Sequence, residues 1–250
     1  MLAAAARTGQ PVSFFYCANP MSIQMKGKLR RWGLLDRQGP RRFLRHVSGI
    51  IHVGANEGQE RKLYDQYGLN VLWVEALDEA FHVLVENLAG FPKQRAIQCL
   101  VTDRDDGEYT FHVASNAGAS SSIFDLHMHR DIWPEVTYTT KTKMKSKTLV
   151  GLLRDEGLEP SAYDALVMDT QGSELLILEG AASCLGGFKY IQTEVADFEA
   201  YKGCCQLADL ESFLSCHGYA EDARKVIARH PEGGKYYEIV FRRDLGRSQR

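Results

Sequence analysis

The fold is decided by the stretch Gly49-Ile-Ile-His-Val-Gly-Ala-Asn-Glu-Gly58. It begins as a short, mostly apolar run that stops at Gly54, which is the pattern of a strand buried on both faces of a parallel sheet. Glycines in the turn that follows let the backbone approach a ligand closely, and a helix N-terminus placed there can meet a carboxylate or a phosphate. The spacing is G-x-x-x-G, which differs from the G-x-G-x-x-G of dinucleotide-binding turns and from a P-loop.

Strands and helices alternate outward from this stretch. Apolar runs predict further strands at 70–75, 95–102, 108–113, 163–169 and 188–195, and helical spacing predicts helices at 57–67, 78–88, 148–156, 172–185 and 206–217. Residues 219–228 and 235–242 are expected to close the sheet as an antiparallel pair. The alternation predicts an α/β fold with a mostly parallel sheet and helices on both faces.

Two segments do not fit this alternation. Lysines at every second position from 141 to 147 predict an exposed edge strand with all lysines on one face. The polar, serine-rich stretch 114–136 lacks a regular period and is too long for a plain connection, so we expect a functional loop or lid.

Composition places the chain among ordinary globular proteins. Its 250 residues are 44% apolar and 25% charged, with a formal net charge of −2, and this length fits one large domain or one domain with an appendage. No apolar run approaches the ~20 residues that span a bilayer, and the N-terminus lacks a signal-peptide pattern. The six cysteines form no C-x-x-C pair, so we expect free thiols and a cytoplasmic protein.

Positive charge is concentrated before the first strand. Residues 26–46 hold eight lysines and arginines against one acid, Asp36, and we assign residues 1–48 to a basic N-terminal extension and 49–245 to the main domain. The segment is either a solvated arm or a dock for an anionic substrate, such as a phosphosugar, a nucleotide or an anionic lipid surface. The balanced charge of the whole chain argues against a general nucleic-acid binder.

Two further strand ends carry residues suited to a nucleoside ligand. Glu75 ends the second strand, 21 residues after Gly54, and an acid at about that separation is placed to accept both ribose hydroxyls of an adenosine cofactor. Thr102 and Asp103 close the third predicted strand, where they can hydrogen-bond an adenine amino group. A nicotinamide cofactor would need a third glycine in the turn, and positions 59–61 have none.

These residues resemble a known family. With Val74-Glu75-Ala76, the opening stretch is similar to class I methyltransferases that use S-adenosylmethionine (SAM). The order of further motifs over residues 49–200 resembles the FkbM-type O-methyltransferase family. These motifs are Leu84 to Asn87, Ser120-Ser121-Ser122-Ile123, Lys147-Thr148-Leu149, Asp164 to Glu174, Glu179-Gly-Ala181 and Gln192-Thr-Glu194.

The resemblance implies a seven-stranded Rossmann-like methyltransferase sheet with a C-terminal antiparallel pair, SAM as cofactor and S-adenosylhomocysteine (SAH) as product. It implies methylation of a hydroxyl on a sugar, a glycan or a polyketide-like small molecule. Methylation of a nucleotide or an RNA ribose, and a SAM-binding partner module without catalysis, stay open as alternatives. The implied cofactor contacts are His52, Gly54, Asn56, Glu57, Gly58, Glu75, Ala76, Thr102, Asp103 and Ser121.

An alcohol becomes a good nucleophile only when a base removes its proton. Candidate bases are Asp169 and Glu194 at predicted strand ends and the loop residue His127, with His129 beside it. Two neighbouring carboxylates can raise one pKa towards neutrality or coordinate Mg²⁺, and no residue is assigned as a metal ligand. The family usually has Asp at the position of His52 and Lys at the position of Val167.

Overall fold

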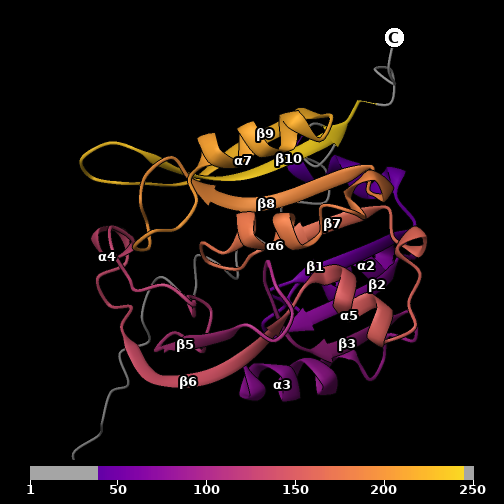
Figure 1. The fold of residues 1–250 in the computed structure, drawn as a ribbon, viewed down its shortest axis with the longest axis horizontal. Helices are drawn as coiled ribbons and strands as arrows, with labels where there is room; N and C mark the ends of the chain where they lie inside the picture. Colours follow the sequence, from indigo (N-terminus) through magenta and orange to yellow (C-terminus); the bar gives the residue numbers. More distant parts are fainter. Residues whose placement is uncertain (1–38, 245–250) are drawn as a thin grey trace, which may run out of the picture. The chain divides into compact units, whose positions relative to one another are not determined.

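A computed structural model describes residues 39–244 of the chain (Figure 1). The large sheet has seven strands in the order β3-β2-β1-β7-β8-β10-β9. Strand β10 is antiparallel to both of its neighbours, and the other neighbouring pairs are parallel, which confirms the predicted architecture. The strands are β1 Gly49–Val53, β2 Asn70–Glu75, β3 Gln94–Gln98, β7 Ala165–Met168, β8 Tyr190–Ala196, β9 Tyr219–Arg229 and β10 Lys235–Arg243.

Helices cover both faces of this sheet because its central strands are apolar on both sides. Ile51 and Leu72 pack under α5 (Leu149–Asp155), α6 (Glu174–Gly180) and α7 (Leu207–Cys216). Ile50 and Trp73 pack on the other face, against α2 (Arg61–Gln66) and α3 (Asp78–Leu88). Each fully buried side chain of this size contributes about 1.5–3 kcal/mol of hydrophobic stabilisation. Figure 1 shows α5, α6 and α7 over the face turned to the viewer.

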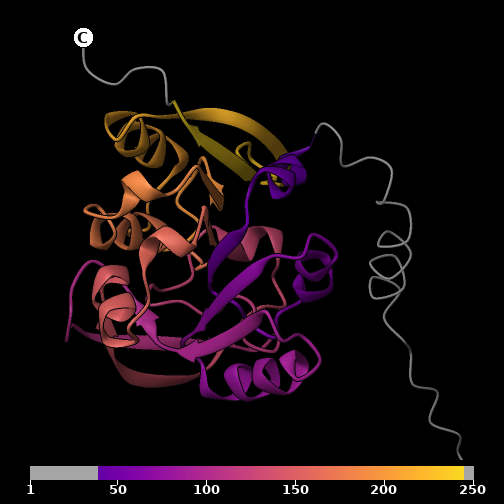
Figure 2. The ribbon, with the colours of Figure 1, turned by 90° about the vertical axis from the view of Figure 1, so that its right-hand side faces the viewer.

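The short 3-10 helix η1 (Pro40–His46) belongs to the second of these layers. Phe43 and Leu44 are buried there, and Arg42 donates to the Asp222 carboxylate from Nε at 3.0 Å and to its carbonyl at 2.9 Å. Figure 2 shows η1 beside the yellow strands β9 and β10. The folded core therefore includes residues before Gly49, where we expected the domain to begin. Of the predicted basic segment, Lys26, Lys28, Arg30, Arg31 and Arg37 lie outside the described residues.

The third strand is shorter than predicted. It leaves the large sheet after Gln98, so the expectation of one strand over 95–102 is wrong. The chain turns because Leu100 and Val101 bury in two different clusters, one with Leu77 and Phe111 and the other under α5 and α6. Leu100–Val101 form β4, which joins a separate three-stranded sheet of order β4-β6-β5, with β5 Glu108–Ala114 and β6 Tyr138–Lys147.

Strand β6 carries the alternating lysines. It pairs with β5 along its length and meets β4 only at Ser146 and Lys147, so most of its other edge is open. Its side chains from Lys141 to Lys147 alternate as predicted, and the four lysines are exposed. The exposed lysine face is confirmed, whereas the expected edge position is wrong, because β6 is the middle strand of the order β4-β6-β5.

The stretch 114–136 is tied down rather than loose. It contains one helical turn, α4 (His129–Ile132), and its backbone is bonded to residues 199–202. The amides of His127 and His129 each donate to the Ala200 carbonyl at 3.0 Å, and the Lys202 amide donates to the Asp125 carbonyl at 2.9 Å. These bonds hold the segment, which we call the lid (residues 114–136), against the loop that follows β8.

Residues 39–244 also show the nature of the helices and the state of five cysteines. None of the helices in this range is long and apolar enough to cross a membrane. Cys99, Cys184, Cys204, Cys205 and Cys216 are free thiols, and Cys17 lies outside the described residues.

Candidate active site

Predicted site residues on or directly after four neighbouring strands of the large sheet stand in one row. The register aligns one residue from each of four adjacent strands, which are Val74 on β2, Val53 on β1, Met168 on β7 and Thr193 on β8. The next positions are Glu75, Gly54, Asp169 and Glu194, and Gln98 on β3 stands opposite Glu75. Because neighbouring strands lie about 4.8 Å apart, this carboxyl-edge row spans about 14 Å from Glu75 to Glu194. Ligands of open α/β sheets bind beyond such an edge.

Gly54 is required where β1 meets β7. Its backbone has φ of +80°, and a Cβ there would lie 2.0 Å from the Asp169 carbonyl oxygen. Any side chain would therefore clash with a backbone atom that cannot swing away. Gly58, at the far end of the turn, has φ of +70° and would meet Leu84 at 2.7 Å. The glycine pattern thus brings the turn against both the neighbouring strand and α3.

Glu75 is held by two backbone amides. Asn56 N donates to Oε2 at 2.7 Å and Leu77 N donates to Oε1 at 2.8 Å, with only 7% of the residue exposed. Burial raises the pKa of the Glu75 carboxyl, and the two amide bonds oppose that rise. Each carboxylate oxygen can accept two hydrogen bonds, and each accepts one here from a backbone amide, so one acceptor position is left on each oxygen. That pair of positions suits two adjacent hydroxyl groups.

The turn after β1 is linked to the start of the lid. Asn56 Oδ1 accepts from the Glu57 amide at 2.9 Å, and Asn56 Nδ2 donates to the Ala117 carbonyl at 3.2 Å. Ser121 accepts from the Ala114 amide through Oγ at 3.0 Å and is buried next to Gly118. The structure therefore places Asn56, Glu57 and Ser121 near one another. Ala76, directly after β2, is partly buried.

His52 lies in the layer below the edge. Its ring stacks on Trp73 with centroids 4.8 Å apart, and its Nδ1 is 3.1 Å from the Tyr64 hydroxyl. Burial lowers the pKa of His52, which favours the neutral imidazole. Its partner in the register on β7 is Val167. The two departures from the family pattern are thus neighbours, and replacing an Asp and a Lys together leaves no unpaired buried charge.

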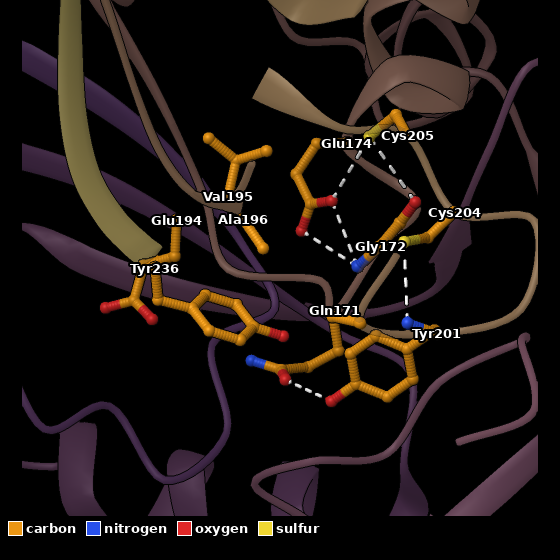
Figure 3. Close-up of a pocket in the computed structure, with 11 residues that line it drawn as sticks. Gln171, Gly172, Glu174, Glu194, Val195, Ala196, Tyr201, Cys204, Cys205 and Tyr236 are labelled. Carbon is orange, nitrogen blue, oxygen red and sulfur yellow. Dashed lines mark hydrogen bonds between the residues drawn. The ribbon is translucent and has the colours of Figure 1, made fainter. Parts of the chain in front are cut away.

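Asp169 is oriented by a glutamine that sequence reasoning missed. Gln171 Nε2 donates to Asp169 Oδ1 at 2.6 Å. The amide cannot flip freely because Tyr201 donates to Gln171 Oε1 at 2.5 Å (Figure 3). Ser122 Oγ donates to the Gln171 carbonyl at 2.8 Å, and the residue adopts a φ of +57°. Gln171 lies inside the quoted Asp164–Glu174 motif, but its partners come from segments that are distant in sequence.

The two carboxylates at the β7 and β8 ends form a coupled pair. Burial raises the pKa of Asp169 to about 7, with the charge of Glu174 adding to the rise and the Gln171 bond opposing it. Burial also raises the pKa of Glu194 well above its usual range, and Asp169 adds to this effect. No residue in the range 39–244 donates a hydrogen bond to the Glu194 carboxylate. The pair can therefore share one proton near neutral pH.

A small, partly open pocket lies beside Glu194. Figure 3 shows the Glu194 carboxylate beside the Tyr236 ring, with Gln171 between Tyr236 and Tyr201. Glu174 has a structural position, since it accepts from the amides of Thr170 and Gly172. The lining residues are Gln171, Gly172, Glu174, Glu194, Val195, Ala196, Ala200, Tyr201, Cys204, Cys205 and Tyr236.

The lid histidines lie differently from what the sequence suggested. His127 is exposed and its Nδ1 lies 3.3 Å from Glu199 Oε2, outside the residues that line the pocket. His129 is buried, and its Nδ1 lies 3.3 Å from the hydroxyl of Tyr236, which does line the pocket. Burial lowers the pKa of His129 to about 4, so it is neutral at physiological pH.

Thr102 and Asp103 do not end a strand of the large sheet. Thr102 is fully buried, and its carbonyl packs against Gly180 at the far end of α6. The Asp103 carboxylate accepts from Arg104 at 2.8 Å and from the Tyr109 hydroxyl at 2.8 Å, and these bonds outweigh its burial and lower its pKa. The strand-end position that we expected them to fill is occupied by Gln98, whose amide is 3.2 Å from Asp78 Oδ1. Within 39–244, no group of three or more His, Cys, Asp or Glu side chains is gathered to hold a metal ion.

The strand order, with β10 antiparallel, is that of a Rossmann-like methyltransferase fold. Residues 52–221 match the family model described as "Methyltransferase FkbM domain". The chain therefore belongs to the FkbM family of SAM-dependent methyltransferases.

Three solved structures are similar to this chain at low identity. An uncharacterised protein from Listeria monocytogenes is 9% identical with a TM-score of 0.47, covering 84% of this chain and 69% of its own. Magnesium protoporphyrin IX methyltransferase from Synechocystis, with bound SAM, is 9% identical with a TM-score of 0.43, covering 88% and 79%. The 1,6-didemethyltoxoflavin N1-methyltransferase from Burkholderia thailandensis, with bound 1,6-didemethyltoxoflavin and SAH, is 12% identical with a TM-score of 0.41, covering 95% of this chain and 94% of its own. Comparison with the curated proteins gave no match.

Proposed function

We propose that this protein transfers the methyl group of SAM to a hydroxyl oxygen on a sugar, a glycan or a polyketide-like small molecule. The observation that carries the proposal is the carboxylate pair Asp169 and Glu194 at the carboxyl edge. A pair that can hold a proton near pH 7 is suited to remove one from an alcohol. The FkbM membership supplies the reaction class.

The residues of the β2 and β1 ends fit the cofactor. Gly54 leaves no side chain between the turn and β7, and Glu75 keeps two acceptor positions for the ribose hydroxyls. Asn56, Glu57, Gly58, Ala76 and Ser121 surround this part of the edge. Gln98 replaces Thr102 and Asp103 as the candidate for adenine recognition, because it stands next to Glu75 in the register.

When bound, SAM supplies a methyl group on a positively charged sulfur, and the chain's own residues align and activate the acceptor. Asp169 is fixed through Gln171 and Tyr201, whereas the Glu194 carboxylate has no donor from residues 39–244 and is available to an acceptor hydroxyl. Holding acceptor and donor about 3 Å apart can supply roughly 7–11 kcal/mol of the barrier. Tyr201 and Tyr236 give the pocket apolar walls with hydroxyl groups.

The acceptor class is tested by a product screen. The full chain is incubated with SAM and separate pools of sugars, glycans, hydroxylated polyketide-like compounds, nucleosides and RNA, and the position of the new methyl group is determined by mass spectrometry and NMR. Methyl ethers on the small molecules or glycans support the proposal. Methylated RNA ribose, or methyl groups on nitrogen or carbon only, contradict it. SAM binding without transfer to any pool would favour a partner module.

A metal arm separates two uses of the carboxylates. Each active reaction is repeated with EDTA and with added Mg²⁺. Equal rates support direct proton removal by the Asp169–Glu194 pair. A rate that falls with EDTA and returns with Mg²⁺ would assign the pair to oxygen ligation of the ion instead.

A further inference from the structure

Among the described residues, the side chains that line the pocket include acids but no bases. Glu174 and Glu194 line it from α6 and β8, and Asp169, directly after β7, stands next to Glu194 in the carboxyl-edge row. No lysine, arginine or histidine is among the described residues that line it. The largest charge effects on Asp169 and Glu194 come from other carboxylates, including Glu60 and Glu75 for the first and Glu238 for the second.

The three acids are not equivalent. Glu174 is satisfied by backbone amides of its own turn, and Asp169 receives the Gln171 amide, which carries no net charge. Glu194 receives no donor from residues 39–244. Glu238, opposite Glu194 on β10, faces Arg41 and Lys225 instead, at 4.0 and 3.7 Å. The Tyr201 and Tyr236 hydroxyls face the site from the other side, and burial raises their pKa values, so both stay neutral.

A partly buried carboxylate without a cation is costly, so a positive ligand centre is favoured here. Asp169 abuts Gly54, in the middle of the row, and Glu75 stands on the other side of that glycine. A cofactor held by Glu75 at its ribose would extend along the row towards Asp169. Its sulfur is positive in SAM and neutral in SAH.

We propose that the Asp169–Glu194 pair recognises the positive sulfur of SAM, so that the site selects SAM over SAH by charge and takes up a proton as that charge disappears. This inference rests on the proposed function. In the transfer, the acceptor O–H bond breaks and an O–CH₃ bond forms, while the S–CH₃ electron pair stays on sulfur. The released proton goes to the carboxylate pair, whose neighbouring cation has just been lost. The net charge of the site is unchanged, and SAH is left without its charge partner.

The test is calorimetric titration of the full chain from pH 5.5 to 7.0, in two buffers of different ionisation enthalpy. The probes are SAM, SAH and an analogue in which a protonated amine on carbon replaces the sulfonium. The cation stabilises the ionised pair, so binding of SAM below pH 7 must expel a proton. We expect binding of SAM and of the amine analogue to release protons. Their affinities should therefore increase with pH, by up to about tenfold per pH unit. SAH should release fewer protons and tighten less.

Two variants sharpen the result. Glu194→Gln should reduce the SAM-to-SAH affinity ratio and flatten its dependence on pH, while the matched control Glu179→Gln, an exposed residue of α6, should keep both. Asp169→Asn serves the same purpose if Glu194→Gln does not fold. Equal pH dependence and proton release for SAM and SAH in the unchanged protein would overturn this inference while leaving the proposed function standing. Failure of SAM and SAH to bind would overturn both.

Discussion

The two halves of the carboxyl-edge row hold their acids in opposite ways. At the β2 and β1 ends, Glu75 is fixed by backbone amides from Asn56 and Leu77, which lie next to the same strands. In the half formed by β7 and β8, Asp169 accepts from the Gln171 side chain, which the distant Tyr201 holds in turn, and the Glu194 carboxylate has no donor from residues 39–244. We propose that the first half keeps its hydrogen bonds during a reaction cycle and that the second half changes its protonation.

The largest expected effect comes from the second half. Asp169→Asn should lower methyl transfer by about 10²–10⁴-fold, because a positioned base contributes on that scale. SAM affinity should change far less than turnover. Initial rates with the acceptor from the product screen, set beside SAM titrations of the same variant, measure the two effects. If neither rate nor affinity changes, Asp169 is only structural.

Gly54→Ala tests the rigidity of the first half. The new Cβ would lie 2.0 Å from the Asp169 carbonyl oxygen on a backbone with φ of +80°, so we expect a loss of about 3 kcal/mol of unfolding free energy. The matched control is Gly90→Ala, where a Cβ meets nothing within 4 Å and the change should be under about 1 kcal/mol. Urea denaturation measures both. Equal stabilities would show that the turn can move away from β7.

Glu75→Ala tests the ligand contact of the first half. It removes two acceptor positions and should weaken SAM binding by about 1–3 kcal/mol. Glu79→Ala, on the exposed first turn of α3, serves as control and should bind SAM normally. Calorimetry compares the two dissociation constants. Unchanged SAM affinity in Glu75→Ala would show that the ribose does not bind at this strand end.

The acids of the second half should make folding stability depend on pH. The pKa of Asp169 is raised to about 7 from an ordinary value of 3.8, so the folded state binds this proton more tightly than the unfolded state. The stabilisation that protonated Asp169 gives the folded state is therefore fully present below about pH 4 and is lost as pH rises through 7. We expect unfolding free energy to fall by about 1–2 kcal/mol between pH 5 and 8, and less so in Asp169→Asn. Parallel curves for the two proteins would show that Asp169 titrates normally.

Tyr201→Phe should have the smallest effect. It removes the hydroxyl that fixes the Gln171 amide and should cost about 1 kcal/mol of stability. The freed amide can then turn its oxygen towards Asp169, which should move the rate profile to higher pH. Tyr67→Phe, at the end of α2, is a control for loss of a tyrosine hydroxyl. An unmoved pH profile in Tyr201→Phe would show that Gln171 is fixed by its backbone alone.

The comparison also explains what the sequence could predict. The β1 turn and Glu75 belong to neighbouring stretches with a fixed spacing, and Asp169 and Glu194 end apolar runs, so all were found from local pattern. Gln171, Tyr201 and Tyr236 meet only after the lid and β10 fold over the edge, and no local pattern marks them. The third strand is shorter than its apolar run predicts. Leu100 and Val101 continue that run, but their side chains pack into two other clusters and not against the large sheet's third strand.

The central claim is that the row from Glu75 to Glu194 holds SAM. The most direct test is calorimetric titration of the full chain with SAM, SAH and NAD at pH 7, with and without Mg²⁺. The account predicts micromolar binding of SAM and SAH, no binding of NAD, and loss of SAM affinity in Glu75→Ala but not in Glu79→Ala. Binding of NAD, or binding of none of the three, would contradict it.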